Sequence, residues 1–319
     1  MQYIATEELA DEQFVAYFEQ RVKDTIESYN LFDKDEKLLV AASGGKDSTV
    51  LLYLLKKFGY EVEAITINAH IGCYSDASLE NLKKFCTKEN IMLHEVSLQQ
   101  EFGYKLCHIM AIMEEKGFNK TSCSICGTLR RYLLNKHGKK LGAKILLTGH
   151  NLDDEAEGIL MTLFNGNLKQ AARIGPLTVS NSGIFVKRAK PLYFVFEDEV
   201  ERYSKIMNFD VHYGWCPCSV KAARRFYAEL DINPENKFNI ISNIINNTSK
   251  LRNYFKEKSA LKCCMMCEQP TSHDICQTCT ILSTIKDTSV KKIKLDAAVA
   301  KFEVAHNSCE PQQALIQIK

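Results

Sequence analysis

The sequence predicts an α/β protein in which helices cover both faces of a parallel sheet. Short apolar runs typical of buried strands lie at residues 37–43, 62–67, 91–96 and 144–148. Between these runs, residues 50–58 and 76–89 carry apolar side chains at helical spacing. Strands that alternate with helices are typical of a parallel sheet. Such sheets bind ligands at the carboxyl ends of their strands, where the turns at Ser43 and Thr148 lie.

The chain divides into five predicted segments. Apolar residues recur every four positions from Phe14 to Ile26, which indicates an amphipathic helix near the start. After residue 233 the spacing is helical only, and a cysteine cluster and a lysine-rich stretch follow. The segments are a helical arm at 1–36, the α/β domain at 37–233, a helical region at 234–258, a small zinc ribbon at 259–284 and a tail of unassigned role at 285–319.

Composition excludes several classes of protein. The chain has 319 residues, 45% hydrophobic and 25% charged, which is typical of a globular protein and not of a disordered, collagen-like or coiled-coil chain. No apolar run reaches the ~20 residues that span a bilayer. Residues 1–14 are acidic and contain no basic residue, unlike a signal peptide. We therefore expect a cytoplasmic protein without a membrane partner.

The charge and cysteine counts narrow the function further. A net charge of +2 is no general sign of nucleic-acid binding, so any basic surface would be local. The 13 cysteines are unusual for a chain of this length. In a reducing cytosol, clustered cysteines indicate metal ligands or catalysts and not disulfides.

A glycine-rich turn directly follows the first predicted strand and precedes a helix. Its six residues are Ser43, Gly44, Gly45, Lys46, Asp47 and Ser48. Glycines let backbone N–H groups approach a phosphate closely, and the helix N-terminus and Lys46 add positive charge. The serines can donate hydrogen bonds, and Asp47 could hold Mg²⁺, which binds few carboxylates together with phosphate oxygens. The spacing differs from that of the Walker loop, so it predicts a phosphate site of another kind.

This hexapeptide resembles the PP-loop of the ATP pyrophosphatases, which cleave ATP between its α and β phosphates and adenylate a substrate. Further matching motifs are residues 148–155, Cys123 and Cys126 with Arg130 and Arg131, Cys216, and the cysteine pairs near the carboxyl end. In this order they resemble the tRNA thiolation branch, most closely the tRNA 2-thiouridine synthetases. The resemblance covers residues 14–282. It implies an adenine nucleotide α hydrolase-like fold, with ATP held by residues 43–48, Gly149 and His150.

Two cysteine pairs near the carboxyl end have the spacing of a zinc site. Two residues separate Cys264 from Cys267, and two separate Cys276 from Cys279. Such knuckles converge to give four thiolates in tetrahedral geometry, and four protein ligands make a closed, structural zinc site. Cys263 is spare, although it could replace Cys264. The alternative is four free or buried cysteines.

A second set, Cys123, Cys126 and Cys216, has only three members. Cysteine thiolates hold [4Fe–4S] clusters. Three ligands would leave one iron open, and that iron could carry the sulfide for a transfer reaction. The alternative is persulfide and disulfide chemistry without a cluster, and Cys218 could serve either scheme. The three could also be small core residues.

Carboxylates and basic residues complete the candidate site. Asp153 and Asp154 open a predicted helix, where they could act in catalysis near the target base or metal, or cap the helix. His150 either contacts phosphate or substrate or is a packed histidine. The candidates for RNA binding are Arg130, Arg131, Lys139, Lys140, Arg224 and Arg225. Basic segments bind the phosphate backbone, although many are only solvated helix faces.

Together these features predict an enzyme that thiolates a base in tRNA. ATP with Mg²⁺ would adenylate the 2-oxygen of a uridine and release pyrophosphate, and a hydrosulfide or cluster-bound sulfide would then replace AMP. The expected cofactors are ATP, Mg²⁺, a [4Fe–4S] cluster and Zn²⁺. The expected partners are tRNA, a sulfur donor (a thiocarboxylated ubiquitin-like carrier, a persulfide or sulfide) and a second copy of the chain in a homodimer.

Three alternatives stay open. The first is tRNA 2-thiocytidine synthesis, against which the zinc ribbon argues. The second is a sulfur-free ligase that acts through an adenylate, against which the three-cysteine set argues. The third is a non-catalytic RNA-binding protein, against which the intact phosphate loop argues.

Overall fold

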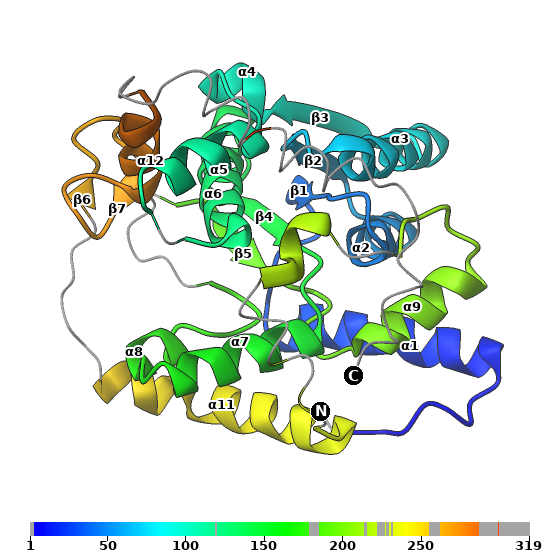
Figure 1. Ribbon diagram of the computed structural model, residues 1–319. Coiled ribbons are helices and arrows are strands. Elements are labelled where there is room, and N and C mark those ends of the chain that lie inside the picture. Colours follow the sequence, from blue (N-terminus) through cyan, green and yellow to red (C-terminus); the bar gives the residue numbers. More distant parts are fainter. Residues whose placement is uncertain are drawn as a thin grey trace, which may run out of the picture.

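A five-stranded parallel sheet forms the centre of the molecule (Figure 1). The computed structural model describes residues 3–118, 120–178, 185–213, 216–221, 227, 230, 232–254, 262–286 and 299. The strands, in spatial order, are β3 (Met92–Ser97), β2 (Val62–Asn68), β1 (Leu38–Ala41), β4 (Ile145–Thr148) and β5 (Lys187–Ala189). All neighbouring pairs are parallel. The predicted fold class is confirmed.

One face of the sheet is covered by four helices. They are α1 (Asp11–Ser28), α2 (Lys46–Lys57), α3 (Gly72–Lys88) and α9 (Glu197–Ile206). Phe18 of α1 stacks on Tyr203 of α9 with ring centroids 4.6 Å apart, and both side chains are fully buried. The predicted amphipathic helix near the start therefore packs into the main core, because its apolar stripe meets α9.

The other face of the sheet packs against α6 (Ser122–Lys140). Leu133 of this helix lies among Leu39, Ile65 and Leu146 of the central strands. The short helix α4 (Leu98–Phe102) and α5 (Leu106–Glu115) lie beside α6. Each central strand is buried on both faces, which explains its nearly continuous apolar sequence.

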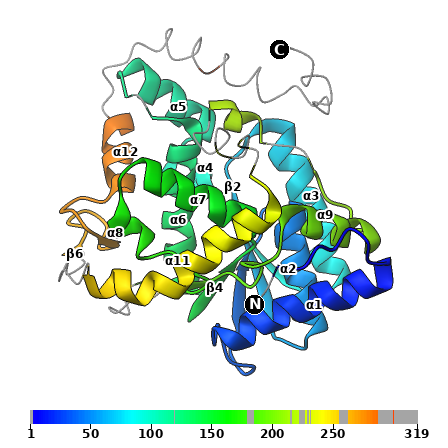
Figure 2. The same ribbon diagram turned by 90° about the horizontal axis from the view of Figure 1, so that it is seen from below.

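The carboxyl-terminal elements pack onto this α/β unit at two places. Helix α11 (Pro234–Tyr254) lies along α7 (Leu152–Phe164) and α8 (Leu168–Ala171), as Figures 1 and 2 both show. Phe238 and Ile241 of α11 are buried there. The ribbon consists of β6 (Lys262–Cys263), β7 (Pro270–Thr271) and α12 (Gln277–Lys286). Its helix buries Ile281 and Ile285 against α5 and α6.

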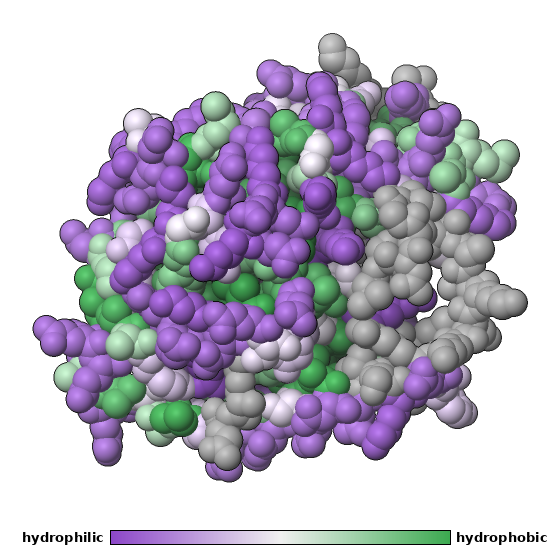
Figure 3. Space-filling model, turned by 180° about the vertical axis from the view of Figure 1, so that it is seen from behind, coloured by the Kyte–Doolittle hydropathy of each residue, from purple (hydrophilic) through white to green (hydrophobic). Residues whose placement is uncertain are grey.

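Within the described part of the chain, no helix is both long and apolar enough to cross a bilayer. Figure 3 shows hydrophilic side chains over most of one face of the molecule.

Candidate active site

The phosphate loop follows β1 and ends in the first turn of α2, as the sequence predicts. The Ser43 N–H donates to Ser48 Oγ at 3.1 Å, and the Gly45 N–H donates to Ser43 Oγ at 3.3 Å. Gly44 has a φ of +83°, and a Cβ there would lie 2.1 Å from the carbonyl oxygen of Ser78. Only glycine fits at that position, because both the backbone angle and the space exclude a side chain.

A second loop, after β4, closes onto the phosphate loop. A Cβ on Gly149 would lie 2.9 Å from the backbone carbon of Asp47, so only glycine permits this approach. The side-chain amide of Asn151 donates to Asp47 Oδ1 at 3.0 Å. The strands that follow β1 in sequence, β2 and β3, lie on one side of it, and β4 and β5 lie on the other side. Open α/β sheets bind ligands in the crevice at the carboxyl ends of the two strands where the order reverses in this way. His150 is exposed and its Nδ1 lies 2.8 Å from Thr148 Oγ1.

The two charged side chains of the loop, Lys46 and Asp47, contact each other, and Lys46 also contacts helix α9. Lys46 Nζ lies 2.7 Å from Glu197 Oε1 and 3.5 Å from Asp47 Oδ2. Although burial works to lower the pKa of Lys46, these carboxylates raise it. Burial raises the pKa of Asp47, as do the charges of Asp154 and Glu197. The loop thus places one largely buried cation, Lys46, beside the carboxylates of Asp47 and Glu197.

The two carboxylates predicted for catalysis, Asp153 and Asp154, hold helices in place. Asp154 and Asn151 bond reciprocally at the start of α7, which makes a capping box. Asp153 Oδ1 accepts from Lys237 Nζ of α11 at 2.7 Å. Its Oδ2 accepts from the Glu197 N–H at 2.8 Å. Asp154 therefore takes part in the cap of α7, whereas the contacts of Asp153 join α7 to α9 and α11.

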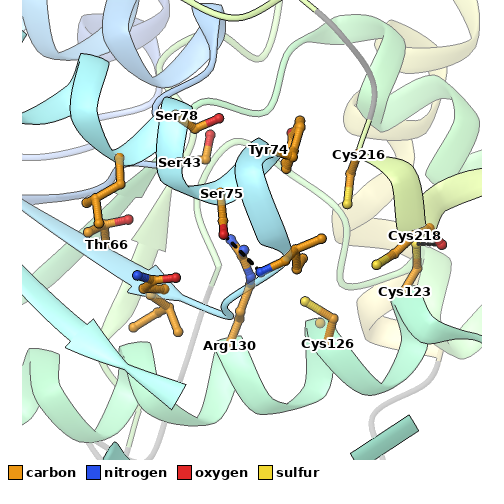
Figure 4. A pocket seen from close by; sticks show the side chains of 15 residues that line it. Ser43, Thr66, Tyr74, Ser75, Ser78, Cys123, Cys126, Arg130, Cys216 and Cys218 are labelled. Atoms are coloured by element: carbon orange, nitrogen blue, oxygen red, sulfur yellow. Dashed lines mark hydrogen bonds between the residues drawn. The ribbon is translucent and has the colours of Figure 1, made fainter. Parts of the chain in front are cut away.

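A cavity of about 290 Å³ joins the phosphate loop to four cysteines (Figure 4). Its lining includes Ser43, Thr66, Asn68, Tyr74, Ser75, Ser78, Cys123, Cys126, Arg130, Cys216 and Cys218. Cys123 and Cys126 lie in the first turns of α6, and Cys216 and Cys218 lie at the short helix η1 (Pro217–Lys221). The structure thus brings together Cys126 and Cys216, which are distant in sequence, as predicted.

Within this group of cysteines, Cys216 and Cys218 form a thiol pair in which the pKa of Cys216 is lowered and that of Cys218 is raised. The Cys218 side chain, hydrogen-bonded to the Cys216 sulfur, lowers the pKa of Cys216 to about 7. Cys123 Sγ lies 3.7 Å from the carbonyl oxygen of Cys218. The guanidinium of Arg130 points into the cavity toward Ser75 (Figure 4). Burial works to lower the pKa of Arg130, but the sulfurs of Cys126 and Cys216 raise it.

The ribbon cysteines form a compact group. Cys264, Cys267, Cys276 and Cys279 have Sγ atoms that all lie within 4.8 Å of one another. The Cys276 N–H donates to Cys264 Sγ at 3.2 Å. Such backbone donors outweigh burial and lower the pKa of Cys264 to about 6. Cys263 is exposed and is not part of this group, so the spare cysteine is identified.

The four basic residues predicted for RNA binding that the structure describes lie at two separate places. Arg130 lines the cysteine cavity, and Arg131 is exposed one position further along α6. Lys139 and Lys140 are exposed at the other end of this helix, ~20 Å from the cysteines at 1.5 Å per residue. Lys139 borders a second cavity, of about 410 Å³, near the start of β4. Arg224 and Arg225 lie outside the described residues.

Sequence reasoning missed Glu197, Tyr74 and Lys237. No motif marks Glu197, because its partner Lys46 is 151 residues away. Tyr74 lines the cysteine cavity and packs edge-on against His212. Arg130 was predicted only as an RNA-binding residue, although its spacing from Cys126 indicates a place beside the cysteines. It follows Cys126 by four positions, and residues four apart share a helix face.

A phosphate loop at the centre of a parallel sheet, beside a thiol-lined cavity, defines an α/β nucleotide-binding protein. The chain belongs to the PP-loop domain family, whose model matches residues 14–213. This confirms the resemblance drawn from the loop and the cysteine motifs. The matched span begins within α1 and ends after α9, so it contains the whole sheet.

Named relatives extend over most of the chain. It is 36% identical over 293 residues to the tRNA-5-methyluridine(54) 2-sulfurtransferase of Pyrococcus horikoshii, covering 90% of this chain and 92% of that protein. It is 33% identical over 281 residues to the cytoplasmic tRNA 2-thiolation protein 1 of Aspergillus niger, covering 84% and 80%. A solved structure, the U34-tRNA thiolase NcsA from Methanococcus maripaludis with its [4Fe-4S] cluster, superposes with a TM-score of 0.70 at 25% identity, covering 89% of this chain and 91% of that one.

Proposed function

We propose that this chain is an ATP-dependent tRNA thiolase that replaces the 2-oxygen of a uridine with sulfur. The observation that carries the proposal is the single cavity that Ser43 of the phosphate loop and Cys123, Cys126 and Cys216 line together. A nucleotide on the loop and a sulfur held by the thiols would meet there. The similarity to tRNA sulfurtransferases and tRNA thiolation proteins supports the same reaction.

The phosphate loop carries the activation step. Its backbone N–H groups, the start of α2 and the ammonium of Lys46 would hold the phosphates of ATP. Asp47 would contribute a carboxylate oxygen to Mg²⁺. The uridine 2-oxygen attacks the α-phosphorus, and pyrophosphate leaves. The 2-oxygen then carries AMP, which a sulfur nucleophile displaces from C2 of the base.

The cavity thiols suit an iron–sulfur cluster. Three thiols, Cys123, Cys126 and Cys216, line one space from two segments, and the hydrogen bond from the Cys218 side chain lowers the pKa of Cys216. These residues would hold a [4Fe–4S] cluster, which when bound supplies an iron that can carry a sulfide. Cys218 is placed to donate a hydrogen bond to a bound sulfur. Arg130 adds a fixed positive charge beside the thiolates.

The ribbon suits structural zinc. Four sulfurs within 4.8 Å of one another, with backbone N–H groups donating to them, match a closed tetrahedral site. Cys264, Cys267, Cys276 and Cys279 would be its ligands. The side-chain amide of Asn135 on α6 donates to Gln269 Oε1 at 2.7 Å, which ties the ribbon to the helix that bears Cys123 and Cys126.

The partners follow from the reaction. The substrate is tRNA, and its backbone would contact exposed basic residues such as Arg131. The sulfur donor would be a thiocarboxylated ubiquitin-like carrier, a persulfide or sulfide. The chain would act as a homodimer in the cytoplasm. The name of the Aspergillus relative supports that location.

Mass spectrometry of tRNA nucleosides tests the proposal in cells. In cells that lack this gene, one 2-thiouridine derivative should disappear from tRNA, and the wild-type gene should restore it. The names of the relatives give positions 54 and 34, so mapping the loss to one position assigns the substrate. A 2-thiocytidine that disappears instead, or an unchanged nucleoside profile, would contradict the proposal.

A further inference from the structure

The cation of the phosphate loop already has a strong partner outside the loop. Glu197, the first residue of α9, places its Oε1 2.7 Å from Lys46 Nζ. The Lys46 side chain is only 13% exposed, whereas that of Glu197 is 45% exposed. The lysine is therefore held inward by a carboxylate that reaches it from the solvent side.

Glu197 is itself fixed in place. Its N–H donates to Asp153 Oδ2 at 2.8 Å, and the other oxygen of Asp153 accepts from Lys237 at 2.7 Å. The Phe196 N–H donates to Glu199 Oε2 at 2.8 Å, which caps the same helix end. Helices α7, α9 and α11 therefore set the position of Glu197 next to the loop.

The pair has two consequences for a phosphate ligand. First, the largely buried ammonium of Lys46 is oriented by two carboxylates, that of Glu197 at 2.7 Å and that of Asp47 at 3.5 Å. Second, an ammonium engaged at 2.7 Å with a carboxylate must be released or shared before it binds a phosphate oxygen. The negative charge of Glu197, next to Lys46, would also repel a polyphosphate bound at the loop.

We propose that Glu197 is a positioning residue that holds Lys46 at the phosphate loop and competes with ATP for it. This inference rests on the proposed binding of ATP at residues 43–48. It assigns the acidic start of α9 a role in setting nucleotide affinity. Glu197→Gln keeps the size of the side chain and an oxygen acceptor but removes the competing charge.

Calorimetric titration of the full chain with ATP, with and without Mg²⁺, tests the inference. Glu197→Gln should tighten ATP binding at least threefold in both conditions. The matched control is Glu201→Gln, one turn further along α9. It removes the same charge from a residue that pairs with Lys205 at 2.5 Å, and it should leave the affinity within twofold.

The contrary outcomes are separable. The inference would be overturned if Glu197→Gln changed ATP affinity by less than threefold or if Glu201→Gln had an equal effect. It would also be overturned if Glu197→Gln weakened ATP binding only in the presence of Mg²⁺, because Glu197 would then be a metal ligand. Loss of the fold would also weaken binding, so the expected tightening cannot come from structural damage. If the wild-type chain binds no ATP, the proposed function fails, and the inference fails with it.

Discussion

The side chain of Asn151 donates to Asp47 across 3.0 Å, although 104 residues separate the two in sequence. The same side chain caps α7 through its oxygen, which accepts from the Asp154 N–H at 2.9 Å. One asparagine therefore joins the loop after β4 to the phosphate loop and begins a helix. The two roles can be separated by substitution.

Asn151→Ser should keep the cap and lose the bond to Asp47, whereas Asn151→Ala should lose both. Both variants should weaken ATP binding to a similar degree, because Asp47 loses the same donor. Only the alanine variant should also lose ~1 kcal/mol of unfolding free energy, the usual value of an N-cap. Urea unfolding and ATP titration measure the two effects. Normal ATP affinity in both variants would show that Asp47 needs no such support.

Gly44→Ala should disrupt the phosphate loop. Its Cβ would meet the Ser78 carbonyl oxygen at 2.1 Å, so the backbone must shift and ATP binding should fall at least tenfold. Gly59→Ala is the matched control, because Gly59 also has a positive φ, +85°, but nothing lies within 4 Å of its Cβ position. That variant should lose ~1 kcal/mol of stability through backbone strain and bind ATP normally. Equal ATP affinity in the two variants would contradict the assigned loop geometry.

Much of the fold can be predicted from the sequence, because β1, β2 and β4 lie inside the sheet, are largely buried and carry apolar runs. The strand β3 lies at one edge of the sheet with only Val96 buried, and its apolar residues still mark it. The edge strand β5 has the sequence Lys-Arg-Ala, with only Ala189 buried, so hydrophobicity does not reveal it. The loop, the ribbon cysteines and the pair Cys123 and Cys126 are also predictable, since their spacing is local, whereas Cys216 is distant in sequence and is assigned from the family resemblance. Contacts between distant segments, such as Lys46 with Glu197, depend on how the helices are placed and leave no local pattern.

The positions of the basic residues on α6 also could not be predicted from the sequence. A run of positive charge along α6 predicts an RNA surface, but a run does not say which way each side chain points. Arg130 shares the helix face of Cys126 and lines the cavity, whereas Lys139 and Lys140 end the helix far from it. Arg130 and Lys139 are separated along α6 by the rise of 1.5 Å per residue, and the period of 3.6 residues places successive side chains at different angles around the axis.

The ribbon should lose zinc when one ligand is removed. Cys267→Ser should abolish bound zinc and destabilise the segment from β6 to α12, because a structural zinc site contributes directly to folding. Cys263→Ser, a neighbouring exposed cysteine outside the sulfur group, should keep zinc at the wild-type content. Metal analysis of both purified proteins measures this. Zinc loss from the Cys263 variant alone would mean that the ligand set includes Cys263.

Iron content should separate Cys216 from Cys218. Protein prepared without oxygen should carry about four irons, the content of a [4Fe–4S] cluster. Cys216→Ala should lose them, whereas Cys218→Ala should retain them, because Cys218 is expected only to donate a hydrogen bond to sulfur. Iron analysis and absorbance spectra of the two variants make the comparison. If Cys218→Ala also loses the iron, Cys218 is a ligand and no iron is left open for sulfide.

The most direct test is an anaerobic reaction of the purified, iron-loaded protein with ATP, Mg²⁺, sulfide and unmodified tRNA. The reaction should form 2-thiouridine in the tRNA and one AMP for each sulfur inserted, as liquid chromatography with mass spectrometry measures. Lys46→Ala should form neither product. Thiolated tRNA without AMP, AMP without thiolated tRNA, or a thiolated base other than uridine would contradict the account.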